Sequence, residues 1–182
     1  MQPPKNFWGN KTRNSRILTP STPLPLRISL LVIGRTTDRH VQSLIDDYAS
    51  RLQHYVPFSL DVIPELKNTR ALSPEQQKAA EADLIRRQLQ AGDHVVLLDE
   101  HGHERRSVEF AAWMQKRMAT GARRIVFIVG GPYGFDPSIH ALAAEEISLS
   151  QMTFSHQLIR VLFVEQLYRA QSILRGEPYH HE

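Results

Sequence analysis

The sequence contains no cysteine, and this absence removes several kinds of chemistry at once. Disulfide bonds, cysteine metal sites and thiol nucleophiles are excluded across all 182 residues. No apolar run reaches the roughly 18 residues that a membrane-spanning helix needs. A Walker A loop and the Rossmann pattern G-x-G-x-x-G are also missing, so the sequence does not support triphosphate hydrolysis or a Rossmann-type dinucleotide site.

The composition is otherwise that of a globular protein. Hydrophobic residues make up 41% of the chain and charged residues 23%, which is ordinary for a folded domain. The length is sufficient for one domain with a sizeable core. The absence of cysteine is compatible with a reducing compartment, and we expect a cytoplasmic protein.

Acidic residues are missing from the first 26 positions, and this shapes the net charge. That segment holds four of the 22 basic residues and five of the eleven prolines. The rest of the chain has 18 basic and 19 acidic residues, a net charge of −1. The formal charge of +3 therefore depends on the leader, and the body alone does not have the charge of a nucleic-acid-binding protein.

Residues 1–26 are predicted to be a disordered, basic, proline-rich leader, and residues 27–182 a single domain. The leader lacks the apolar core of a secretory signal. A transit peptide and an upstream start codon both remain open as explanations for it.

Strand-like and helix-like segments alternate after the leader. Apolar runs bounded by turn residues predict strands, and 3.6-residue spacing with capping residues predicts helices. Ser73-Pro74-Glu75-Gln76 is a clear helix start, with an N-cap serine and a proline in the first turn. Strands are expected at 28–33, 58–63, 94–98, 124–129 and 146–149, and helices at 38–54, 73–91, 107–120, from 136 and at 156–174. This alternation predicts an α/β fold with a mainly parallel sheet flanked by helices.

A glycine turn, Gly130-Gly131-Pro132-Tyr133-Gly134, follows the predicted strand 124–129. A second loop, 147–156, precedes the last helix. Glycines after a strand allow the backbone to approach a ligand closely, and ligands of open α/β sheets bind at the carboxyl ends of strands. Leu98 ends another strand at the same edge. A tight turn and simple core packing are the structural alternatives for these residues.

The histidines and acidic residues after Leu98 do not predict a catalytic or metal site. Asp99 and Glu100 are adjacent and should point to opposite faces of a strand, so we interpret them as solvated charges at a strand end. His101, His103 and Glu104 lack a third ligand at zinc spacing and are interpreted as a polar turn. We therefore predict no metal site.

The last helix and the tail hold the remaining candidates. Arg160 lies one turn after His156, so both are expected near one face. Glu165 and Arg169 are four residues apart and predict an ion pair within the helix. The chain ends in Tyr179-His180-His181-Glu182, and a histidine there titrates near neutrality, as proton transfer requires. A frayed terminus is the structural alternative.

Four strings together resemble a known family. They are Gly130-Gly131-Pro132, Leu149-Ser150-x-Met152-Thr153-Phe154-x-His156, Arg160-Val161-Leu162-x-x-Glu165-Gln166-Leu167-Tyr168-Arg169-Ala170, and Tyr179-His180. This pattern is similar to that of the ribosomal large subunit methyltransferase H family, in the SPOUT class of knotted methyltransferases. The resemblance runs from about Arg27 to Glu182, and the leader is a departure from it.

The resemblance implies a SPOUT-type fold with a C-terminal trefoil knot, which no spacing in the sequence shows. It implies S-adenosyl-L-methionine as cofactor and methylation of pseudouridine N3 in the helix 69 loop of 23S rRNA, within the assembled ribosome. It also implies a homodimer, with the last helix contributing to the interface. The residues it assigns to the cofactor are Leu98, Gly130, Gly131, Leu149, Ser150, Gln151, Met152, Thr153 and Phe154. The residues it assigns to the reaction are His180, Arg160, Tyr179 and His156.

Two other functions remain open at this point. One is a noncatalytic ribosome-associated binding protein, which the survival of the glycine turn, the loop and Tyr179-His180 disfavours. The other is a SPOUT methyltransferase with a tRNA target, which the absence of a tRNA-binding extension disfavours.

Overall fold

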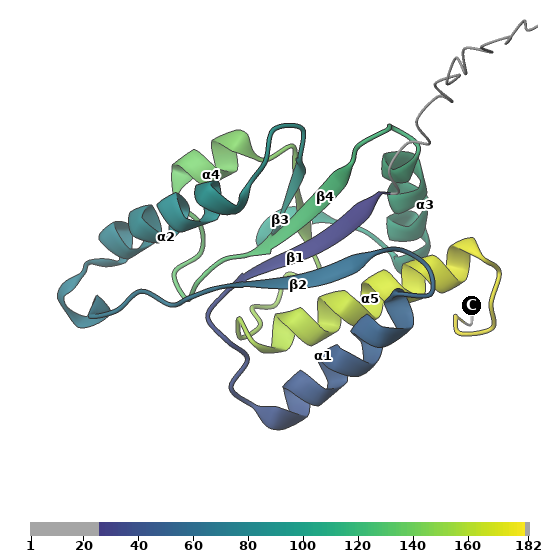
Figure 1. Ribbon diagram of the computed structural model, residues 1–182, viewed down its shortest axis with the longest axis horizontal. Coiled ribbons are helices and arrows are strands. Elements are labelled where there is room, and N and C mark those ends of the chain that lie inside the picture. The colour runs from purple at the N-terminus through teal and green to yellow at the C-terminus, as the bar shows by residue number, and fades with distance from the viewer. Residues whose placement is uncertain (1–25, 181–182) are drawn as a thin grey trace, which may run out of the picture.

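The computed structural model describes residues 26–180, so the predicted leader lies almost wholly outside the described residues (Figure 1). A five-stranded parallel sheet has the order β2-β1-β4-β3-β5. The strands are β1 (Arg27–Ile33), β2 (Phe58–Ile63), β3 (His94–Glu104), β4 (Arg124–Val129) and β5 (Glu145–Ser148). The helices are α1 (Arg39–Leu52), the short 3₁₀ helix η1 (Thr69–Ala71), α2 (Pro74–Gln88), α3 (Ser107–Met118), α4 (Pro137–Leu142) and α5 (Leu158–Leu174). The predicted α/β class with a parallel sheet is confirmed.

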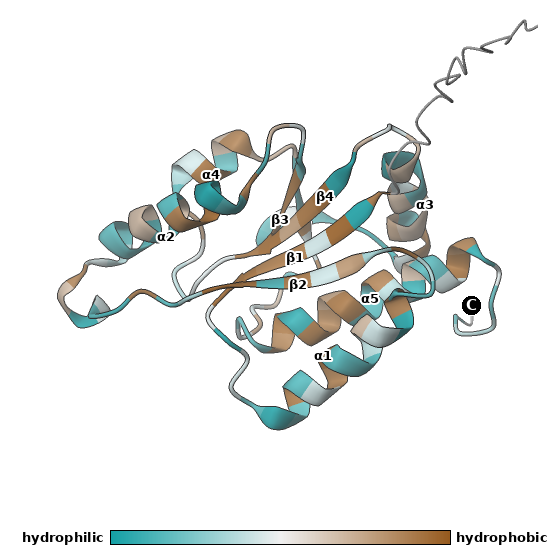
Figure 2. Cartoon of the chain, in the orientation of Figure 1, coloured by the Kyte–Doolittle hydropathy of each residue, from teal (hydrophilic) through white to brown (hydrophobic). Residues whose placement is uncertain are grey.

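Helices cover both faces of the sheet, which is why β1 and β4 at its centre are largely apolar. Helices α1, α3 and α5 lie on one face, and α2 and α4 lie on the other (Figure 1). Successive strand residues point to opposite faces, so Phe127 of β4 packs toward α3 and α5 while Val126 and Ile128 pack toward α2. Figure 2 shows the resulting band of hydrophobic residues along β1 and β4.

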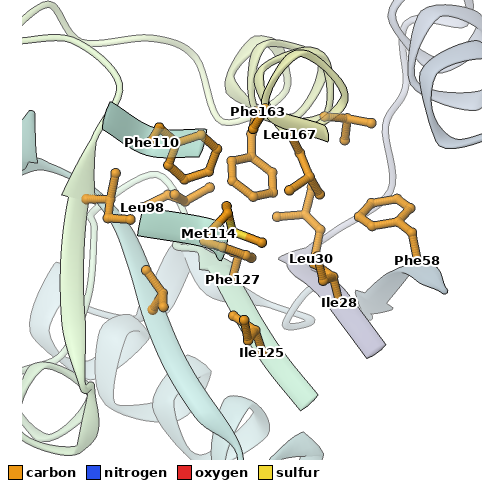
Figure 3. Close-up of a cluster of buried hydrophobic side chains, with 14 of the residues drawn as sticks. Ile28, Leu30, Phe58, Leu98, Phe110, Met114, Ile125, Phe127, Phe163 and Leu167 are labelled. Carbon is orange, nitrogen blue, oxygen red and sulfur yellow. The ribbon is translucent and has the colours of Figure 1, made fainter. Parts of the chain in front are cut away.

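The larger core lies beneath α5. Phe127 and Phe163 have ring centroids 4.5 Å apart, and Phe110 of α3 packs edge-on to both rings (Figure 3). All three side chains are buried. Burying an aromatic side chain of this size contributes about 1.5–3 kcal/mol relative to leaving it exposed. This packing fixes α5 over the sheet and thereby sets the position of the loop that precedes it.

The helix starts follow the local chemistry. Ser73 and Gln76 form the predicted reciprocal capping box, with Pro74 in the first turn of α2. The Asp38 carboxylate accepts the backbone N–H groups of His40 and Val41 and so caps α1. Ser107 is the first residue of α3 and not its N-cap, which is Arg106, and the Ser107 hydroxyl donates to Gln166 of α5.

The prediction that β3 ends at Leu98 is also wrong. The strand continues to Glu104 after a register shift, and His103 and Glu104 pair with Ile147 and Ser148 of β5. The interpretation of residues 101–104 as a polar turn fails for the same reason. We call residues 99–104 the β3 arm. Its backbone hydrogen bonds to β5 stabilise a strand that side-chain hydrophobicity does not indicate.

Candidate functional site

A cavity of about 700 Å³ opens at the carboxyl ends of β3, β4 and β5. This volume is typical of a small-molecule site, and its place at the carboxyl edge is where ligands of open α/β sheets bind. Its walls come from the end of β3 and the arm, from the glycine turn, and from the loop between β5 and α5. The predicted residues that line it are Leu98, Gly130, Gly131, Leu149, Ser150, Met152, Thr153, Phe154 and His156.

The glycine turn forms one wall of the cavity. Gly131 and Gly134 form an isolated antiparallel bridge, with the Gly134 N–H donating to the Gly131 carbonyl at 3.1 Å. Gly134 has a φ of +77°, which glycine adopts at little cost. A Cβ at Gly130 would lie 3.3 Å from Gly134 backbone atoms and from the Phe135 ring. A side chain at this position would therefore require Gly134 or Phe135 to shift by a few tenths of an ångström, and with glycine the backbone itself forms this wall.

Glu81 of α2 supports the glycine turn from behind. Its side chain is buried, and the Gln77 amide donates to its Oε1 at 2.8 Å. A Cβ at Gly131 would overlap the Glu81 carboxyl group, which explains glycine at this position. Burial raises the pKa of Glu81, and the nearby Glu65 carboxylate acts in the same direction.

The β3 arm holds the loop that forms the opposite wall. Thr153 donates from its hydroxyl to Glu100, and the Gln151 amide donates to Glu104 at 3.1 Å. Gln151 therefore points to the arm and does not line the cavity, whereas Met152 is 74% exposed at the cavity mouth. Filling of the core is thus excluded as the role of Met152. Glu100, which we predicted to be a solvated strand-end charge, instead holds this loop together with Glu104.

Gly102 allows the arm to cross β5 at very short range. A Cβ on this residue would lie 2.7 Å from backbone atoms of Glu146 and Ile147. Glycine is therefore required at the crossing, and the arm rests directly on the β5 backbone. The sequence does not single out Gly102, because a lone glycine among polar residues is most simply interpreted as a turn.

The mouth of the cavity is acidic. Asp99 and Glu100 line it, and the Asp99 carboxylate lies 2.9 Å from Nδ1 of His101. This hydrogen bond to Asp99 raises the pKa of His101, and Glu100 and Glu146 add to the effect. His140 also lines the cavity, and its Nδ1 lies 2.6 Å from the Glu146 carboxylate. Side chains of one sign at a cleft attract ligands of the opposite charge, so this mouth favours a cationic ligand.

Arg160 does not reach the cavity. Its side chain is 1% exposed, and the guanidinium donates to the carbonyls of Ile33, Gly34 and His156 and to the Thr36 hydroxyl, at 2.7–3.1 Å. Burial lowers its pKa, with the nearby Glu65 carboxylate acting in the opposite direction. The expectation that Arg160 and His156 share a face toward a substrate is therefore not met, because only His156 lines the cavity. Arg160 instead ties the segment after β1 to the start of α5.

The tail also lies away from the cavity of its own chain. Tyr179 donates to Glu165 at 3.0 Å and lies 3.2 Å from the Tyr48 hydroxyl, while Nδ1 of His180 lies 3.5 Å from Arg169. The predicted pair of Glu165 and Arg169 is present. Figure 1 shows the tail beyond the carboxyl end of α5, whereas the cavity lies at the start of that helix.

Tyrosine rings hold the tail in place. Tyr168 packs against the rings of Tyr48, Tyr55 and Tyr179, with centroid separations of 4.8–5.8 Å. Tyr168 therefore has a packing role. Burial and the bonds to Tyr48 and Glu165 raise the pKa of Tyr179, so this phenol stays protonated. As far as residue 180, the tail is therefore docked rather than frayed.

The described part of the chain shows neither a metal site nor a membrane-spanning helix. Among residues 26–180, no three His, Cys, Asp or Glu side chains are grouped to hold a metal ion. Within the same range, no helix has the length and apolar character to cross a membrane.

Comparisons with known proteins identify relatives of this chain. Residues 26–180 match the family model described as "Predicted SPOUT methyltransferase". Two relatives, from Phocaeicola vulgatus and Bacteroides fragilis, share 59% and 57% identity over 157 residues, which cover 86% of this chain and 100% of theirs. Both are called "Ribosomal RNA large subunit methyltransferase H". A solved structure of a probable methylase family protein from Haemophilus influenzae Rd KW20 is similar with a TM-score of 0.46 and 12% identity, covering 88% of this chain and 72% of that one.

Proposed function

The chain belongs to the SPOUT methyltransferase family, and from this membership we propose that it is an S-adenosylmethionine-dependent methyltransferase of large-subunit ribosomal RNA. The observation that carries the proposal is the match to the full length of relatives with that name, at 52–59% identity in several cases. Two of the four strings that carry the resemblance, Gly130-Gly131-Pro132 and the loop 149–156, line the 700 Å³ cavity. A noncatalytic binding protein or a tRNA methyltransferase is less consistent with these observations.

We place the methyl group on N3 of a pseudouridine in the helix 69 loop of 23S rRNA. The assembled ribosome is the proposed substrate, because the described residues 26–180 form one small domain and recognition of the RNA is then expected to depend on the shape of the ribosomal subunit. This substrate also places the protein in the cytoplasm. The leader 1–26 lies outside the catalytic domain in this proposal.

The cavity fits S-adenosylmethionine. When bound, this cofactor supplies a methyl group activated by a sulfonium sulfur. The wall at Gly130 offers backbone groups at a position where a Cβ would be tightly packed, and the mouth at Asp99 and Glu100 carries charge opposite to that of a sulfonium. Leu98, Gly131 and the loop 149–154 complete the proposed binding set, with Gln151 contributing through its bond to the arm.

Methyl transfer also requires the pseudouridine N3 to be deprotonated, because a protonated nitrogen is a poor nucleophile. His180 is the proposed proton acceptor or orienting group, Tyr179 packs beside the substrate, and His156 faces it from the cavity wall. Arg160 acts indirectly in this scheme. By fixing residues 33–36 against the start of α5, it sets the position of His156.

We propose a homodimer in which the tail of one subunit completes the cavity of the other. The tail does not line its own cavity, yet Met152 and Tyr133 at the mouth, and Leu158 at the start of α5, expose apolar surface. Exposed apolar surface of this kind marks sites of interaction. The family fold also implies a C-terminal trefoil knot, and the bonds between loop 149–154 and the β3 arm are compatible with it.

A methyl-transfer assay with labelled S-adenosylmethionine tests the function directly. The wild-type protein is expected to label 23S rRNA in ribosomes that lack the modification, and to leave tRNA unlabelled.

Gly130→Val should abolish labelling, because the added side chain would collide with Gly134 and Phe135 in the cavity wall. Calorimetry should show cofactor affinity at least tenfold weaker, with the fold retained by circular dichroism. Labelling of tRNA alone would refute the proposed substrate, and unchanged cofactor affinity in Gly130→Val would remove this turn from the site.

His180→Ala should lower single-turnover methyl transfer by roughly 10²–10⁴-fold, the usual contribution of a positioned acid or base. Cofactor affinity should remain nearly unchanged, because His180 lies outside the cavity of its own chain. Methyl transfer by a mixture of His180→Ala and Gly130→Val subunits shows in which subunit's cavity the tail acts. If the tail acts in the partner's cavity, mixed dimers regain one intact site from two inactive variants. A wild-type rate for His180→Ala would show that the base lies elsewhere, and an inactive mixture would place the tail's action within one chain.

A further inference from the structure

A second cavity, of about 400 Å³, lies at the carboxyl ends of β1 and β2. It is lined by Arg35, Thr37, Val62, Pro64 and Glu65. Because all five strands are parallel, this cavity and the cofactor cavity open at the same edge of the sheet. Val62 is 42% exposed although it lies in a strand, so the cavity has an apolar floor open to solvent.

Hydrogen bonds link the segments that border the two cavities. The side-chain amide oxygen of Gln157 accepts from the backbone N–H and the hydroxyl of Thr37, at 3.0 and 3.2 Å. Gln157 directly follows His156, which lines the cofactor cavity. The buried Arg160 guanidinium fixes the same segment through the carbonyls of Ile33 and Gly34. A molecule held at the second cavity is therefore held in a fixed relation to the first.

Four exposed cations lie on the segments that follow β1 and β2, and one of them, Arg35, lines the second cavity. They are Arg35, Arg39, Lys67 and Arg70. Within residues 26–180, none of the four forms an ion pair or a side-chain hydrogen bond. Elsewhere arginines are neutralised: Arg124 pairs with Asp93, and Arg105 and Arg117 pair with Glu145. Unpaired cations beside a cavity are available to bind an anion.

We propose that the surface at the carboxyl ends of β1 and β2, which comprises the second cavity with Arg35 and the adjoining segments that carry Arg39, Lys67 and Arg70, binds the phosphate backbone of the rRNA segment that flanks the target nucleotide. The proposal rests on the proposed function, because it assumes a ribosomal RNA substrate. Flexible cationic side chains contact phosphates without reading sequence and thereby set the register of the strand. The strand then crosses the carboxyl edge of the sheet from the β2 side toward the cofactor cavity at β4. The net charge of −1 outside the leader does not oppose this, because a phosphate interacts mainly with the cations near it and not with the net charge of the whole domain.

The triple variant Arg35→Ala/Lys67→Ala/Arg70→Ala tests the surface. Its matched control is Arg87→Ala/Lys116→Ala/Arg123→Ala, which removes the same charge from exposed side chains at the opposite edge of the sheet. Binding to 70S ribosomes that lack the modification is measured from 50 to 200 mM salt, the range over which phosphate binding weakens steeply. KM for ribosomes and cofactor affinity are measured alongside. The surface variant should bind ribosomes at least tenfold more weakly and raise KM to match, with cofactor affinity unchanged. The slope of log K against log salt should fall by about 1 for each phosphate that the variant no longer binds.

Equal losses in the two triple variants would overturn the proposal, because the effect would then follow from net charge alone. An unchanged salt slope in the surface variant would overturn it as well. Failure of the proposed function is a separate result, recognised when the wild-type protein transfers no methyl group to ribosomes. The binding measurement still decides in that case: a selective loss in the surface variant supports an RNA-binding surface, and its absence refutes one.

Discussion

Arg160→Met is expected to lower the free energy of unfolding by about 3–5 kcal/mol, the largest stability effect of any single substitution considered for this chain. Methionine fills much of the space of the arginine side chain but donates no hydrogen bond. The carbonyls of Ile33, Gly34 and His156 would then be left without their buried donor. Each unsatisfied buried polar group costs about 1–3 kcal/mol, which sets the scale of the loss.

Urea denaturation measures this effect, with Arg175→Met as the matched control. Arg175 follows the same helix, is exposed, and makes a hydrogen bond to the His54 carbonyl. Its replacement should cost no more than about 1 kcal/mol, as for other exposed charged groups. Comparable losses in the two variants would show that the buried network contributes little. A fully stable Arg160→Met variant that transfers no methyl group would restore the interpretation of Arg160 as a residue in direct contact with the substrate.

Gly102→Ala is expected to weaken S-adenosylmethionine binding by more than tenfold. The added methyl group would collide with the backbone of Glu146 and Ile147, and backbone atoms of a paired strand cannot move aside as a side-chain end can. The arm must lift from β5, and the bonds from Gln151 and Thr153 to its carboxylates would break. The cavity wall at 149–154 would then be ordered only when the cofactor binds, and this ordering reduces the net affinity.

Calorimetric titration of the cofactor measures this effect, and Gly92→Ala is the control. Gly92 has a φ of +87° with no atoms near its Cβ position, so alanine there strains the backbone without touching the cavity. Both variants should lose stability, but only Gly102→Ala should lose affinity. Wild-type affinity in Gly102→Ala would show that the arm does not shape the site.

Secondary structure can be predicted from the sequence where a short run of residues favours one conformation by itself. Apolar runs locate every strand, and the Ser73-Pro74 start of α2 follows from capping chemistry that acts within a single turn. The β3 arm escapes prediction because its residues other than Gly102 are polar, and only backbone pairing with β5 makes them a strand. Such pairing depends on a partner far along the chain and leaves no local pattern.

The sequence predicts the parts of the candidate site that backbone segments form. It predicts less well the positions of the side chains around the site. The glycine turn and the loop 149–154 both line the cavity, apart from Gln151. An arginine near the start of a largely apolar helix suggests a substrate contact, yet two of the carbonyls that bind Arg160 lie more than 120 residues away. The position of Glu81 next to Gly131 also cannot be predicted from the sequence, because it depends on the packing of α2 on the sheet.

The strand order has a consequence for synthesis of the chain on the ribosome. Strand β1 lies between β2 and β4, so one of its two neighbours is made only after most of the chain has emerged. Helix α5, which covers the Phe127 side of the sheet, is made last. A nascent chain that stops before Leu158 therefore exposes Phe110, Phe127 and their apolar neighbours to solvent. Pairings this distant in sequence slow folding and prolong exposure of apolar surface, so early release of the chain should promote aggregation.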